Sequence, residues 1–256
     1  MNRIHYLVDD DVHLSLISTP HLPEPAVAPP GDLDDPYCLF TPQHYERNYA
    51  YPLVVWLHGP ADDERQVTRV MPLVSLRNYV AVGPRGTRAS RTAGGYHWSQ
   101  DADEIALALE RVLAAVAAAR RWLNIAPGRI YLAGYACGGT MALRVALAEP
   151  RRFAGALSIG GAFPTTLRPL AQLHQARRLK LFLAAGRRSR GYPEREVCNH
   201  LRLLHAAGIS VNLRLYPCGD EVTADMLADM DRWIMEQVAS DEPAARDQPS
   251  HPSRRK

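Results

Sequence analysis

The sequence predicts a single-domain α/β fold, with a mostly parallel central sheet and helices on both faces. Apolar runs of strand length alternate with stretches in which apolar residues recur at helical spacing, the pattern of βαβ units. One run, residues 51–57, is apolar almost throughout, which suits a strand covered on both faces. The 256 residues are 46% hydrophobic, enough for one large core.

Each element follows from its local pattern. We expect strands at 37–40, 51–57, 79–82, 130–133, 153–159, 179–185 and 211–216. Helical spacing predicts helices at 62–74, 101–124, 140–148, 194–207 and 221–238. Asp62 or Asp63 is the expected N-cap of the first helix, and Pro72 should kink or end it. Residues 87–100 are polar and are expected to form an irregular loop.

Composition changes mark the expected boundaries of the domain. Residues 1–17 contain one or two candidate strands, and 18–36 carry six prolines, which predicts a linker or loop. The α/β domain is expected to span 37–239. Residues 240–256 are polar and rich in proline, so we expect a disordered tail.

Charge and cysteine content exclude several classes of function. A net charge of +3 over this length, without a long basic run, argues against a nucleic-acid-binding protein. The four cysteines have no C-x-x-C spacing, so we expect neither a metal site nor a cofactor. No signal peptide or long apolar span is evident, which predicts a cytoplasmic protein without membrane attachment.

Residues 129–147 contain the most informative pattern, R-I-Y-L-A-G-Y-A-C-G-G-T-M-A-L-R-V-A-L. A buried strand, a sharp turn with small residues two before and two after its apex, and a helix form the nucleophile elbow, G-x-S-x-G. Gly134 and Gly138 supply this frame. The apex residue is Ala136, whose methyl group cannot attack a carbonyl.

With this elbow, residues 53–238 resemble the α/β-hydrolase superfamily. They look most like its phospholipase/carboxylesterase branch, which includes acyl-protein thioesterases and related dienelactone hydrolases. The resemblance depends on four segments in order: L-V-V-W-L-H-G, L-A-G-Y-A-C-G-G-T-M-A-L, F-A-G-A-L-S-I-G-G, and Y-P-C-G-D-E with the helix that follows it. It implies the α/β-hydrolase fold and an ancestry in carboxylic ester or thioester hydrolysis.

The same resemblance assigns the catalytic positions, and each holds an unsuitable residue. The serine position falls on Ala136, the acid position on or near Ser189, and the histidine position on Asp220. The two oxyanion-hole donors would be the backbone N–H groups of Cys137 and Pro60, and proline has no N–H. An aspartate cannot act as a neutral imidazole base near pH 7. The resemblance therefore predicts a pseudo-hydrolase that serves as a ligand-binding or interaction module.

Two hypotheses about side chains accompany this prediction. The first places Arg85, Arg187 and Arg188 on the rim of the cleft, where they would bind a small acyl or anionic ligand, with Asp220 paired to one arginine. The alternative is an active hydrolase in which Cys137 is the nucleophile and a histidine, His97 or His58, is the base. Cys137 lies one place beyond the apex, which favours a packing role for its side chain.

Overall fold

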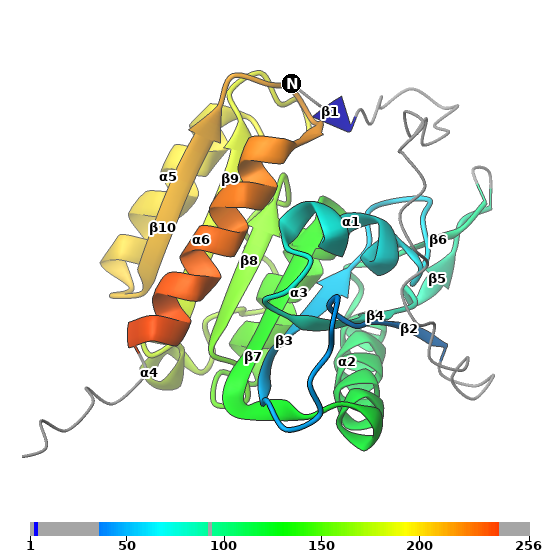
Figure 1. The fold of residues 1–256 in the computed structure, drawn as a ribbon. Coiled ribbons are helices and arrows are strands. Elements are labelled where there is room, and N and C mark those ends of the chain that lie inside the picture. Colours follow the sequence, from blue (N-terminus) through cyan, green and yellow to red (C-terminus); the bar gives the residue numbers. More distant parts are fainter. Residues whose placement is uncertain (1–2, 5–35, 92–93, 241–256) are drawn as a thin grey trace, which may run out of the picture.

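A computed structural model describes residues 3–4, 36–91 and 94–240. Seven strands form one sheet in the order β10-β9-β8-β7-β3-β4-β2 (Figure 1). All neighbours pair in parallel, except that β2 is antiparallel to β4. The strands are β2 (Tyr37–Phe40), β3 (Tyr51–Leu57), β4 (Val80–Pro84), β7 (Ile125–Tyr135), β8 (Gly155–Ile159), β9 (Lys180–Gly186) and β10 (Ser210–Tyr216).

Helices cover both faces of this sheet. In Figure 1, α1 (Gln66–Val74) and α6 (Ala224–Ser240) lie in front of it. Behind it lie α2 (Ala102–Trp122), α3 (Cys137–Ala148) and α5 (Glu194–Ala206), and α4 (Leu173–Ala176) is a single turn between β8 and β9. The predicted single-domain α/β architecture is confirmed.

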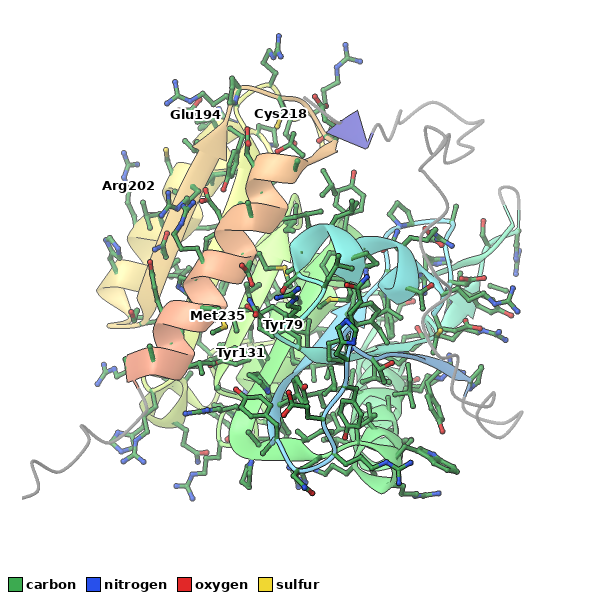
Figure 2. All side chains as sticks on the ribbon, viewed as in Figure 1. Tyr79, Tyr131, Glu194, Arg202, Cys218 and Met235 are labelled. Atoms are coloured by element: carbon green, nitrogen blue, oxygen red, sulfur yellow. The ribbon has the colours of Figure 1, made fainter. Side chains whose placement is uncertain are left out.

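Strand β3 shows why the central run is apolar on successive residues. Val54 and Trp56 pack with α1 and α6, whereas Val55 and Leu57 pack with α2 and α3, and none of these four exposes more than 1% of its surface. Tyrosines fasten the front layer to the sheet; Figure 2 labels Tyr79, whose hydroxyl group donates to the Asp231 carboxylate on α6 over 2.6 Å. Successive residues of β3 are therefore buried in the two hydrophobic cores on opposite faces of the sheet, which is why the run is apolar throughout.

Three local predictions were wrong. The first helix begins at Gln66 and runs through Pro72, and Asp63 accepts the Arg65 N–H in the turn before it instead of capping it. The expected irregular loop contains a hairpin, β5 (Arg88–Ala89) and β6 (Tyr96–His97). The last helix starts later than predicted, because Val222–Thr223 forms β11 and pairs with β1 (Arg3–Ile4).

The predicted segments 5–17, 18–35 and 241–256 lie outside the described residues. Within the described part of the chain, no helix combines the length and apolarity needed to cross a bilayer. Over the same residues, no group of three or more His, Cys, Asp or Glu side chains could hold a metal ion.

Candidate functional site

The turn between β7 and α3 has the sharp geometry of an elbow. Ala136, its apex, has φ 47° and ψ −118°, a conformation that side chains with a Cβ rarely adopt. Its N–H donates to the Ile159 carbonyl over 2.9 Å, and its carbonyl accepts the Thr140 N–H over 3.0 Å. Such strain costs on the order of 1–3 kcal/mol and persists only where the surroundings enforce it. The backbone at the apex therefore keeps the strained conformation of a nucleophile elbow, although its side chain is only a methyl group.

Close packing explains why both framing glycines are present. A Cβ on Gly134 would lie 2.7 Å from the Leu57 carbonyl oxygen and 2.6 Å from the backbone of Gly138. A Cβ on Gly138 would overlap the carbonyl oxygens of Leu57 and His58. The start of α3 thus packs directly on the end of β3, and this contact requires glycine whatever residue occupies the apex.

The loops after β9 and β10 are joined by a hydrogen bond between Ser189 and Asp220. The Ser189 hydroxyl group donates to the Asp220 carboxylate, and its oxygen accepts the Tyr192 N–H over 2.8 Å. The same carboxylate accepts the backbone N–H groups of Arg190 and Gly191, each over 3.1 Å. Ser189 is only 7% exposed. We call this arrangement of Ser189, Asp220 and the two N–H groups the Ser–Asp clamp.

The clamp brings together the two residues that the family resemblance assigns to the acid and histidine positions. The suggested pairing of Asp220 with an arginine side chain is wrong: among the described residues no guanidinium forms an ion pair with Asp220, and Arg190 reaches it through its backbone N–H. Tyr135, the residue before the apex, donates its hydroxyl hydrogen to the Asp220 carbonyl oxygen. The β10 loop is therefore fixed to both the β9 loop and the elbow.

The turn after β3 offers few hydrogen-bond donors. Pro60 lies exposed in this turn and has no N–H. The preceding N–H, of Gly59, donates to the side-chain oxygen of Gln66 over 3.1 Å, an oxygen that also accepts the Trp56 indole N–H over 2.7 Å. The Gly59 N–H is thus already used to attach the turn to α1.

Neither proposed partner of Cys137 forms a hydrogen bond with its thiol among the described residues. His58 is 1% exposed; its Nδ1 lies 2.7 Å from the Gly59 carbonyl oxygen, and its Nε2 accepts the Gly86 N–H over 2.8 Å. Both of its ring nitrogens are therefore engaged. Among the described residues, no hydrogen bond joins Cys137 to His58 or to His97, which lies half-buried on β6.

Burial also makes Cys137 a poor nucleophile. It raises the pKa of the Cys137 thiol, and a hydrogen bond involving the Trp98 backbone offsets only part of that effect. Since the thiolate is the reactive form, little of it is present at neutral pH. The environment favours a packed side chain at the start of α3.

Alkylation should report this directly. Cys137 and Cys198 are both half-buried, but the surroundings of Cys137 raise the pKa of its thiol. We therefore expect iodoacetamide to modify Cys137 roughly tenfold or more slowly than Cys198 at pH 7, and the rate at Cys137 to increase as the pH is raised above 9. Peptide mass spectrometry over a time course measures both residues in one sample. Denatured protein serves as the control, in which the two rates should converge. Rapid modification of Cys137 at pH 7 would contradict the packed assignment.

The arginines assigned to the cleft rim differ in their environment. Arg85 is already paired within the chain: its guanidinium binds Glu64 through two hydrogen bonds of 2.7 and 2.6 Å and lies 4.7 Å from the Tyr96 ring centroid. Burial is the largest single effect on Glu64 and would raise its pKa, but the hydrogen bond from Arg85, a backbone hydrogen bond and the charges of Arg85 and Arg65 together lower that pKa. Arg187 and Arg188 are exposed, and Arg188 donates to the Pro217 carbonyl oxygen.

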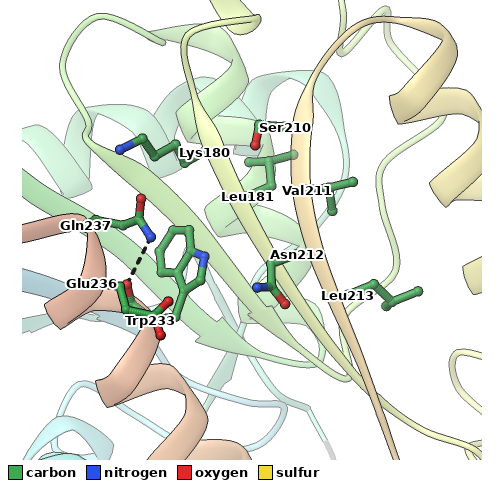
Figure 3. Close-up of a pocket in the computed structure, with 9 residues that line it drawn as sticks. All are labelled: Lys180, Leu181, Ser210, Val211, Asn212, Leu213, Trp233, Glu236 and Gln237. Atoms are coloured by element: carbon green, nitrogen blue, oxygen red, sulfur yellow. Dashed lines mark hydrogen bonds between the residues drawn. The ribbon is translucent and has the colours of Figure 1, made fainter. Parts of the chain in front are cut away.

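A hollow of about 530 Å³ opens where β9 and β10 begin (Figure 3). It includes Lys180 and Ser210, the first residues of β9 and β10, together with Trp233 from α6. The elbow and the Ser–Asp clamp lie instead where the strands end. Binding sites in such sheets form at the carboxyl ends of the strands, so this hollow is not the counterpart of a catalytic cleft.

Comparison with known proteins establishes the family of this chain. A family profile described as Phospholipase/Carboxylesterase matches residues 46–237. The chain belongs to the phospholipase/carboxylesterase family. No curated protein matches it in sequence.

Two solved structures show the same fold as this phospholipase/carboxylesterase-family chain. A carboxylesterase from Mesorhizobium loti is 19% identical, with a TM-score of 0.68 over 82% of this chain and 98% of its own. A Bacillus cereus carboxylesterase is 15% identical, with a TM-score of 0.65 over 80% of this chain and 96% of its own. At such identities the likeness establishes the fold alone.

Proposed function

We propose that this member of the phospholipase/carboxylesterase family does not hydrolyse esters, and that it retains the fold as a ligand-binding or interaction module. The Ser–Asp clamp is the observation that supports this most strongly. It occupies the two loops to which the family resemblance assigns the catalytic acid and histidine. It joins them by hydrogen bonds between a hydroxyl group, two backbone N–H groups and a carboxylate.

The chemistry of ester hydrolysis explains why these side chains are insufficient. The reaction needs a nucleophile at the apex and a neutral base beside it, and Ala136 and Asp220 supply neither. Loss of the nucleophile alone costs about a million-fold in a comparable triad enzyme. One missing oxyanion donor, here at Pro60, costs roughly a further hundred- to thousand-fold. Together, these losses in rate are too large for the retained fold to compensate.

A covalent probe tests the proposal without any choice of substrate. Fluorophosphonates phosphonylate an activated serine in hydrolases that retain the triad, so we expect no adduct on this protein by intact-mass spectrometry. The variant Ala136→Ser is the matched control and should also remain unlabelled, because Asp220 occupies the position to which the resemblance assigns the histidine. An adduct on the natural chain would refute the proposal and would identify its nucleophile by peptide mapping.

A further inference from the structure

Arg144 is a buried cation in the second half of α3. It lies eight residues beyond Ala136, about 12 Å along the helix axis. Only 7% of its surface is exposed. Its Nε donates to the Gln100 side-chain oxygen over 2.6 Å, and its Nη1 and Nη2 donate to the carbonyl and hydroxyl oxygens of Thr166 over 3.0 and 2.9 Å. These bonds hold the guanidinium in one orientation.

No negative charge balances Arg144 within the described part of the chain. Its three bonded acceptors are neutral, and none of the ion pairs among the described residues includes it. Burial lowers the pKa of this guanidinium, yet arginine stays protonated in proteins. A buried charge is costly unless it is paired. Three of the five N–H groups are used, which leaves one on each terminal nitrogen.

Arg144 lines a hollow of about 340 Å³ between α2, α3 and residues 167–172. Its other walls are mainly apolar and include Ile105, Leu147, Leu167 and Pro169. A second cation, Arg168, also lines it, together with Ala102, the first residue of α2. The hollow thus combines an apolar wall with positive charge.

We propose that this hollow, the Arg144 pocket, binds a small organic carboxylate with a short apolar body. A remaining N–H group of the guanidinium can donate a charge-assisted hydrogen bond to a carboxylate oxygen. The apolar wall would cover a hydrocarbon chain, and the volume suits a ligand of that size. Inorganic phosphate fits less well, because it would leave the apolar wall without a partner.

This inference does not depend on the proposed function. The Arg144 pocket lies along α3 from the elbow and uses none of the clamp residues. Hydrolytic activity could be present or absent without changing the charge on Arg144. The competing explanation is that Arg144 only ties α3 to Gln100 and Thr166, in which case its loss would change stability but would not affect binding.

Calorimetric titration of the full chain with sodium octanoate tests the proposal, with 1-octanol and inorganic phosphate as comparison probes. We expect octanoate to bind and Arg144→Met to weaken it by roughly tenfold or more, since charge-assisted hydrogen bonds are lost. 1-Octanol lacks the carboxylate and phosphate lacks the hydrocarbon chain, so both should bind more weakly than octanoate.

A second variant keeps the test valid if Arg144→Met does not fold. Ala102→Phe adds a large side chain at an exposed position that lines the pocket, and it should also abolish octanoate binding. Its matched control is Ala106→Phe, exposed on the same helix but outside the pocket, which should bind octanoate normally. The proposal is overturned if the natural chain does not bind octanoate at millimolar concentrations. Equal affinity in the natural chain, Arg144→Met and Ala102→Phe would overturn it as well.

Discussion

Restoring the serine alone should leave this protein inactive, whereas restoring serine, acid and histidine together should create an ester hydrolase. We expect Ala136→Ser/Ser189→Asp/Asp220→His to hydrolyse p-nitrophenyl acetate roughly a hundredfold or more faster than Ala136→Ser, the gain typical of a positioned base. The reason is structural: the apex already has the strained geometry of an elbow, and the other two positions are already joined by a hydrogen bond.

Initial rates of the purified variants at pH 7 to 8 measure this effect. Asp220→His without Ala136→Ser is the control, because it adds the base without the nucleophile. The missing donor at Pro60 should keep the triple variant well below a natural esterase. Equal rates for Ala136→Ser and the triple variant would show that the loops after β9 and β10 do not present their side chains to the apex.

Removing the Asp220 carboxylate should destabilise the fold by about 2–3 kcal/mol. Asp220→Ala deprives one hydroxyl group and two backbone N–H groups of their acceptor. Hydrogen bonds to charged groups are worth about 1.5–3 kcal/mol each, but Asp220 is half-exposed and water would replace part of that loss. The free energy of unfolding from urea titrations followed by circular dichroism provides the measurement.

Two further variants separate the contributions within the Ser–Asp clamp. Asp220→Asn keeps one acceptor oxygen and should lose about half as much stability, and Ser189→Ala should lose about 1 kcal/mol. Arg187→Ala, an exposed change in the same loop, should be neutral within about 0.5 kcal/mol. If Asp220→Ala proved as neutral as Arg187→Ala, the clamp would have no structural role.

Much of the fold could be predicted from the sequence because strand and helix patterns here are strong. Strand β3 has the expected bounds, since a strand buried on both faces is apolar throughout and its ends are sharp. The β5–β6 hairpin was missed because its strands are two residues long and depend on tertiary contacts. One of these is the hydrogen bond of 2.7 Å from the Tyr96 N–H to the Asp62 carbonyl oxygen.

The site was predictable where it depends on local sequence and unpredictable where it depends on distant partners. Gly134 and Gly138 marked the elbow because the turn itself requires them. The pairing of Arg85 with Glu64 joins residues 21 positions apart and left no local signal. Arg144 did leave one, a single cation in the apolar run of α3, but only the structure shows that neutral acceptors surround it.

The most direct test of the loss of catalysis is hydrolysis of a short-chain p-nitrophenyl ester by the natural chain, measured beside its Cys137→Ala variant. We expect both proteins to show the same background rate, because Ala136 carries no nucleophile and the raised pKa of the Cys137 thiol leaves little of the reactive thiolate. Clear turnover that disappears in Cys137→Ala would contradict the account and would place the nucleophile one residue beyond the apex of the elbow.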